Sequence, residues 1–125
     1  MKVEIKQVKY LGSMHYQDQK SISKVQLEQI PWVQHNFGNR PAWMCILGLI
    51  EELGELSHSS LKRAQGIRTS ENHDDKIKDA VADIVIFLCD FCTSEGIDLE
   101  KEVLKTWNKV KKRDWKKDPT GKQTV

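Results

Sequence analysis

The sequence predicts an all-α fold, a bundle of four main helices preceded by a short extended arm. Apolar residues recur at spacings of three and four over residues 41–64 and again over 74–95, which is the period of an amphipathic helix. A glycine follows each segment, where helices commonly end. The length of 125 residues, with 38% hydrophobic residues, suits a single domain over residues 1–125 with its core at about 20–115.

The first third of the chain carries weaker signals. Charged and apolar residues alternate over residues 1–10, which predicts a short extended arm that Gly12 ends. From about Ser21 the apolar residues are loosely helical. We expect Pro31 to break or kink this first helix, before a turn at residues 36–39.

The remaining helices have clearer boundaries. Pro41 is placed to begin the second helix and Gly66 to end it. Gly96 ends the third helix, and Asp98 is a suitable N-cap for a fourth helix that reaches about Trp115. Residues 116–125 are expected to form a disordered tail.

Charge is divided unevenly along the chain. The formal net charge is +2, yet residues 51–100 carry −7 and residues 101–125 carry +6. The N-terminus lacks the apolar core of a signal peptide and no apolar stretch approaches the roughly 20 residues of a spanning helix, so we expect a cytoplasmic protein without membrane association. The odd count of Cys45, Cys89 and Cys92 argues against a disulfide framework, and the mid-helix pair Cys89 and Cys92 suits small apolar core residues.

Carboxylates lie where a helix would bury them. Glu52 and Glu55 are three apart and share one helix face, with Glu51 turned about 100° away. Asp79 and Asp83 are four apart within the apolar run of the third helix. A buried carboxylate costs several kcal/mol unless it is paired or bound to a cation.

If the second and third helices pack antiparallel, these acids face one another across the seam. Clustered carboxylates without histidine or cysteine point to Mg²⁺ or Mn²⁺ as the relieving cation. The alternative is that the run EELGEL is an ordinary solvated helix face. Gly48 and Gly54 favour close packing, because a glycine inside a helix costs about 1 kcal/mol against alanine.

These residues carry a resemblance. The run EELGEL, an Asp-containing apolar helix about two dozen residues later and a basic fourth helix resemble the MazG-type all-α nucleoside triphosphate pyrophosphohydrolases over roughly residues 32–115. Glu51, Glu52 and Glu55 match the EExxE half of that signature. The ExxD half departs, since Ala80 stands three before Asp83, and the acid one position earlier is a candidate replacement.

The resemblance implies hydrolysis between the α and β phosphates, giving a nucleoside monophosphate and pyrophosphate, as nucleotide-pool house-cleaning. We expect Mg²⁺ to be the cofactor and nucleoside triphosphates to be the substrates. The expected catalytic residues are Glu51 and Glu52, and the expected metal ligands are Glu52, Glu55, Asp79 and Asp83. Helices that are apolar on more than one side also predict a homodimer or homotetramer.

Candidates for the other parts of the substrate flank these acids. Lys109, Lys112 and Arg113 form a cationic stripe suited to phosphate oxygens, unless it is a solvated face over a core stripe. Ahead of the second helix, the candidates for stacking on a base and reading its edge are Trp32, Asn36 and Phe37. They would otherwise be hydrophobic filler, and Trp43, Trp107 and Trp115 are expected in the core or an interface.

Two other functions remain open. A non-enzymatic helical oligomer whose basic tail binds nucleic acid would explain the positive C-terminal region, although we place nucleic acid behind nucleotides as a partner. A degenerate relative that senses nucleotides would explain Ala80. The sequence therefore predicts an enzyme and leaves two binding proteins as alternatives.

Overall fold

The computed structural model describes residues 21–122 and confirms the all-α prediction. The described residues form four helices, namely α2 (Ser21–Phe37), α3 (Trp43–Gln65), α4 (His73–Ser94) and α5 (Leu99–Val110). The second, third and fourth helices were predicted within a few residues at their starts, as was the N-cap of α5, where Asp98 accepts a hydrogen bond from the Lys101 amide. The predicted N-terminal arm lies outside the described residues.

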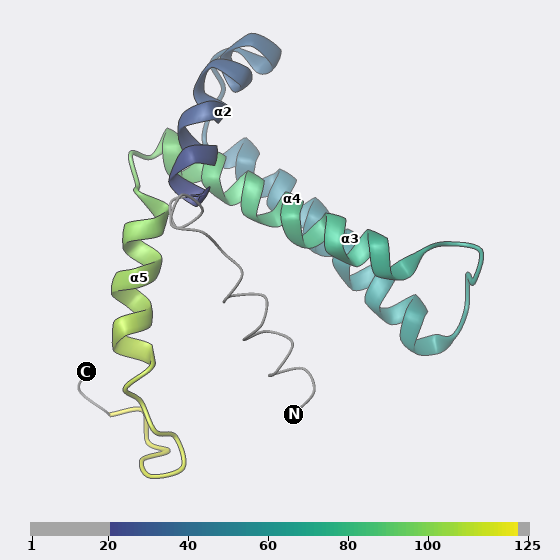
Figure 1. Ribbon diagram of the computed structural model, residues 1–125, viewed down its shortest axis with the longest axis vertical. Coiled ribbons are helices and arrows are strands. Elements are labelled where there is room, and N and C mark those ends of the chain that lie inside the picture. Colours follow the sequence, from purple (N-terminus) through teal and green to yellow (C-terminus); the bar gives the residue numbers. More distant parts are fainter. Residues whose placement is uncertain (1–20, 123–125) are drawn as a thin grey trace.

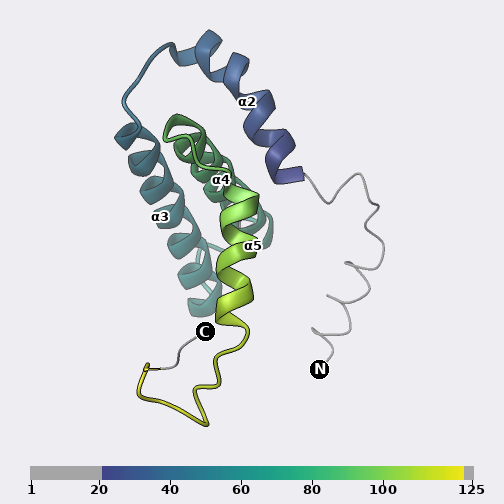
Figure 2. The same ribbon diagram turned by 90° about the vertical axis from the view of Figure 1, so that its left-hand side faces the viewer.

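An antiparallel pair of α3 and α4 is the centre of the structure (Figures 1 and 2). Near the loop that joins them, Arg63 donates to the Asp74 carboxylate at 2.8 Å. Further along the pair, the ring of Phe87 lies directly against Gly48, where a Cβ would meet the ring Cε1 at 2.3 Å. The close approach expected at Gly48 is thus present, whereas nothing lies within 4 Å of a Cβ at Gly54.

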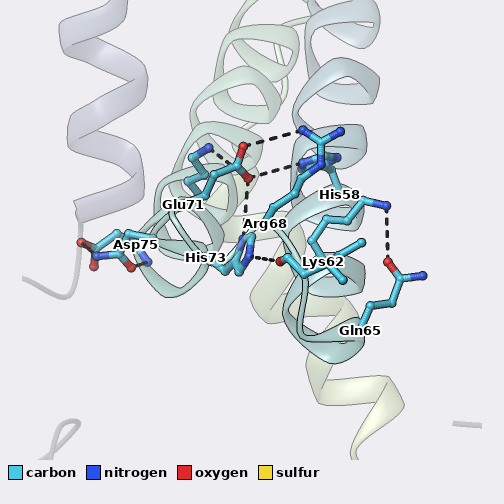
Figure 3. Close-up of polar contacts among 10 residues, drawn as sticks. His58, Lys62, Gln65, Arg68, Glu71, His73 and Asp75 are labelled. Carbon is cyan, nitrogen blue, oxygen red and sulfur yellow. Dashed lines mark hydrogen bonds and ion pairs between the residues drawn. The ribbon is translucent and has the colours of Figure 1, made fainter.

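A polar network closes the α3–α4 connection (Figure 3). Gly66 ends α3 with a φ of 67°, a left-handed conformation that glycine adopts without steric cost. Glu71 then lies among nitrogen groups from both helices and the loop, with Lys76 Nζ at 3.5 Å and the His58 imidazole Nε2 at 3.7 Å from its carboxylate. Burial raises the pKa of Glu71, but Lys76 and Arg68 outweigh it and the net pKa is lowered.

The first helix packs across the C-terminal part of α4 and the start of α5. Gln26 joins all three, because its amide donates to Thr93 Oγ1 and the Ile97 carbonyl and accepts from the Leu99 amide. Below it lies the hydrophobic core cluster, whose buried members are Cys89, Cys92 and Leu99. All three cysteines are free and buried, which confirms the expected core positions of Cys89 and Cys92.

Two helix boundaries differ from the predictions. The first helix continues through Pro31 instead of breaking there, so the proline removes one main-chain hydrogen bond without ending the helix. The last helix ends at Val110, not near Trp115. Asp114 explains the early end, because its carboxylate accepts from the amides of Lys116 and Lys117 and so stabilises a turn in place of further helix.

Much apolar surface remains uncovered. Large apolar side chains of α3, α4 and α5 are exposed in the described structure, among them Ile50, Leu53, Val81, Val85, Leu104 and Trp107. Trp43 and Trp115 are also more than half exposed, so they do not lie in the core of the described structure, and the interface position remains a prediction. Within residues 21–122 there is no helix of the length and apolarity required to cross a bilayer.

The two glycines of α3 give a stability prediction. We expect Gly48→Ala to lower the free energy of unfolding by about 1–3 kcal/mol, because the new Cβ displaces the Phe87 ring. Gly54→Ala is the matched control and should raise the same free energy by up to about 1 kcal/mol, since open space meets its Cβ and alanine favours the helix. Urea unfolding followed by circular dichroism measures both, and equal effects would contradict the packing described here.

Candidate functional site

A cleft of about 450 Å³ lies where α2, the α2–α3 connection, α3 and α4 meet. Its volume falls within the range of sites that hold small organic ligands. Three groups of side chains line it, one aromatic, one acidic and one made of buried polar residues. Its lining residues are Gln29, Trp32, Phe37, Arg40, Met44, Glu52, Asp83, Ile86, Phe87 and Asp90.

The acidic side of the cleft comes from the two central helices. Glu52 on α3 and Asp83 on α4 are both partly buried and line the same space. Burial raises the pKa of Glu52, and the negative charges of Asp83, Glu55, Glu51 and Asp79 raise it further, in that order. The predicted acids therefore repel one another across the helix seam, as their spacing implied.

The other acidic residues of the predicted metal site lie outside the cleft. Glu51, Glu55 and Asp79 are exposed and do not line it, although their charges act on Glu52. Over residues 21–122, no three histidine, cysteine or acidic side chains lie close enough together to hold a metal ion. The side chains would have to converge on a cation to form such a site.

The aromatic side of the cleft contains two of the three predicted base-binding residues. The rings of Trp32 and Phe37 meet edge to face with their centroids 5.7 Å apart, and both are more than half exposed. Asn36 lies elsewhere, because its amide donates to the Trp32 carbonyl at 2.8 Å and the residue does not line the cleft. Stacking surface and acids thus face one space, without the amide that the sequence suggested.

An ion pair between Arg40 and Asp90 forms the third group. Asp90 is only 7% exposed and accepts a hydrogen bond from the guanidinium of Arg40, which also donates to the Cys45 sulfur at 3.1 Å. Burial lowers the pKa of Arg40, but Asp90 outweighs it and the net pKa is raised. The guanidinium lies 5.3 Å from the centre of the Phe37 ring, so the pair also supports the aromatic side.

Gln29 is buried beside this pair, and only one of the two polar atoms of its side-chain amide has a hydrogen-bond partner. Its Nε2 donates to the Ile86 carbonyl at 2.9 Å, and since a carbonyl only accepts, the amide orientation is determined. The Oε1 atom is buried without a hydrogen-bond partner, as is Nε of Arg40. An unpartnered buried polar atom costs about 1–3 kcal/mol, so these two atoms call for an explanation.

The predicted phosphate-binding residues lie away from the cleft. Lys109, Lys112 and Arg113 are not among its lining residues, and α5 diverges from the α3–α4 pair (Figure 1). Only Lys109 belongs to the helix, because α5 ends at Val110 and the next residues form turns. The three cations therefore do not form a single helical stripe over the acids of their own chain.

The sequence analysis missed Asp90, Arg40 and Gln29. Asp90 stands in the apolar run IFLCDFC, so the argument that singled out Asp83 applies to it equally, and in the structure it is the more buried of the two. Arg40 and Gln29 carry no comparable local signal. Their importance comes from contacts with residues 50 and 57 positions away along the chain.

Comparisons with known proteins identify no relative of this chain. No family model, no curated protein and no solved structure matches this chain. The resemblance to MazG-type enzymes therefore rests on the motif residues Glu51, Glu52, Glu55 and Asp83.

Because the pKa of Glu52 is raised, replacing its carboxylate with a neutral group should stabilise the protein, and the size of this gain should depend on pH. A carboxylate whose folded pKa exceeds its ordinary value of 4.5 destabilises the fold increasingly as pH rises through the interval between the two values. Without divalent cations, Glu52→Gln should therefore raise the free energy of unfolding at pH 7, and this advantage should vanish below about pH 4. Urea unfolding across pH measures it.

Glu102→Gln on the exposed first turn of α5 is the control for this experiment. It should not stabilise the protein at pH 7, because it removes a negative charge that favours a helix N-terminus. A Glu52→Gln effect that is independent of pH would contradict the repulsion among the acids.

Proposed function

We propose that this chain is a Mg²⁺-dependent nucleotide pyrophosphohydrolase. It would cleave ribo- or deoxyribonucleoside triphosphates between the α and β phosphates, releasing a nucleoside monophosphate and pyrophosphate, as nucleotide-pool control in the cytoplasm. The observation that carries this proposal is that Glu52 and Asp83 share one cleft with Trp32 and Phe37. A nucleotide needs both surfaces, since its base stacks on aromatic rings and its phosphates are bound through a cation.

The donor set fits a hard divalent cation. Glu52 and Asp83 would hold it, with Glu55 and Asp79 moving inward, and the mutual repulsion of these carboxylates supports the assignment. When bound, Mg²⁺ supplies charge neutralisation for the polyphosphate and acidifies a coordinated water. Glu51 and the unliganded oxygen of Glu52 are the candidates to orient or deprotonate the attacking water.

The substrate would lie along the cleft with its base at the aromatic side. Trp32 and Phe37 offer ring faces and edges for stacking, and Asn36 remains a candidate only if α2 rearranges. A phosphate-binding role for Lys109, Lys112 and Arg113 requires another copy of the chain, because they do not line the cleft of their own. The proposed enzyme is therefore a homodimer or a homotetramer.

The exposed apolar surface supports this self-association. Soluble monomers seldom leave large contiguous apolar patches open to water. Here Ile50 and Leu53 on α3 and Val81 and Val85 on α4 are exposed along the two paired helices. A second copy is the partner that we propose for this surface.

A nucleic-acid-binding oligomer is the alternative function. The exposed cations at and beyond the end of α5, outside the cleft, favour it. A sensor that binds nucleotides without cleaving them is the other alternative, and Ala80 supports it because this buried alanine stands where the motif has an acid.

The test of function is turnover of canonical and modified nucleoside triphosphates with and without Mg²⁺, resolving pyrophosphate from orthophosphate. We expect Mg²⁺-dependent pyrophosphate release that falls by at least about 100-fold in Asp83→Asn, since the substitution removes a metal-binding charge. The control Glu102→Gln should keep wild-type rates, because Glu102 is exposed on α5 and does not line the cleft.

Other outcomes separate the alternatives. Nucleotide binding without release of pyrophosphate would favour the sensor. Salt-sensitive DNA or RNA binding that survives chelation and substitution of Glu52, Glu55 and Asp83, with no turnover, would favour the nucleic-acid-binding protein.

Self-association has its own test. Sedimentation of the full chain at micromolar concentration should give a dimer or a tetramer, and Leu53→Glu should shift it toward the monomer because it puts a charge into the apolar interface. Leu27→Glu is the matched control, as Leu27 is an exposed leucine on α2, outside the α3–α4 surface. A wild-type monomer at this concentration would contradict the proposed oligomer.

A further inference from the structure

We infer that the cleft selects a nucleobase whose Watson–Crick edge carries an amino group beside a ring-nitrogen acceptor, cytosine or adenine, and that Gln29 is the residue that reads it. This inference rests on the proposed function, because it assigns the base subsite of the same cleft. It starts from the Oε1 atom of Gln29, a buried acceptor that has no partner in the described structure.

The acceptor is held in place and lies next to the stacking surface. Gln29 is 9% exposed, and its amide cannot turn over because Nε2 already donates to the Ile86 carbonyl. Gln29 lines the cleft together with Trp32 and Phe37, whose rings offer stacking contacts to a base. In the orientation that we infer, a base stacked there turns its polar edge toward Gln29, the side chains that cover Oε1 shift aside, and a donor on that edge becomes its missing partner.

The neighbouring groups favour an amino group as this donor. Asp90 also lines the cleft, where its carboxylate accepts a hydrogen bond from Arg40, so Gln29 has a second acceptor group beside it. The ring N–H of uracil or thymine is flanked by carbonyl oxygens, which these acceptors would repel. The amino group of cytosine or adenine projects beyond the ring and brings two N–H donors to a recessed acceptor.

Arg40 supplies a group for the rest of the edge. Its Nε is a buried donor without a partner, while its terminal nitrogens are engaged by Asp90 and Cys45. Cytosine and adenine both present a ring-nitrogen acceptor directly beside the amino group. An acceptor from Gln29 and a donor from Arg40 together complement that pair of groups, because the amide nitrogen of Gln29 is already engaged by the Ile86 carbonyl.

The experiment compares affinities for two ligands that differ at this edge. Binding of the non-hydrolysable α,β-methylene analogues of dCTP and dUTP to the full chain is measured by titration calorimetry in the presence of Mg²⁺. We expect wild-type protein to prefer the cytosine analogue by about tenfold. In Gln29→Met, which keeps the side-chain length but removes the acceptor, the preference should fall below about twofold.

Gln34→Met is the matched control, because Gln34 is an exposed glutamine on the same helix and does not line the cleft. It should keep the tenfold preference. The ratio of two affinities on one variant is insensitive to a general loss of stability. A pyrimidin-2-one analogue, which lacks the amino group, tests the same contact in wild-type protein and should bind about as weakly as the uracil analogue.

Equal wild-type affinities for the cytosine and uracil analogues would overturn the inference, as would a preference that persists in Gln29→Met. Different results would reject the proposed function and the proposed base subsite. Selective binding without pyrophosphate release from dCTP would retain the base subsite and reject the hydrolase, whereas turnover that is indifferent to Gln29 would retain the hydrolase and reject the subsite.

Discussion

The ion pair between Arg40 and Asp90 joins the two halves of the candidate site. Arg40 belongs to the short connection between α2 and α3, and Asp90 is buried on α4, so the pair ties the end of α2 to the α3–α4 core. Removing one partner of a buried ion pair typically costs about 3–5 kcal/mol of stability, because the other charge is left buried without a partner. The same guanidinium supports Phe37, and Phe37 meets Trp32. The position of the aromatic side relative to Glu52 and Asp83 thus depends on this one interaction.

A second constraint is that the described chain buries little of its apolar surface. Its core cluster is centred on small side chains, two cysteines and one leucine, while many larger apolar residues face outward. Burial of a large apolar side chain stabilises a fold by about 1.5–3 kcal/mol, and these residues forgo that gain as long as they remain exposed. An oligomer would recover it. Stability and assembly would then be coupled, as in obligate dimers.

The helical periodicity was enough to predict α3 and α4 and their acids, because regular spacing of apolar residues depends only on local geometry. The cost of glycine inside a helix predicted the close approach at Gly48, but the same argument failed at Gly54. The residues that it missed depend on contacts between distant segments, as Arg40 does with Asp90 and Gln29 with Ile86. The early end of α5 was missed for a different reason. Asp114 has a competing local use for its carboxylate, which no apolar pattern reveals.

Electrostatics and packing act in opposite directions at the cleft. The α3–α4 packing brings Glu52 near four other carboxylates, and their repulsion raises its pKa. A site of this kind weakens the fold in return for a strong preference for a cation, because binding relieves the repulsion. The Arg40–Asp90 pair and the packing of Phe87 on Gly48 both lie before Glu52 of α3 and after Asp83 of α4 along the chain, and they hold this end of the helix pair together against the repulsion. Under the proposed function, the repelled charge at Glu52 and the unpartnered acceptor at Gln29 would have one common explanation, a ligand that brings a cation to one side of the cleft and a hydrogen-bond donor to the other.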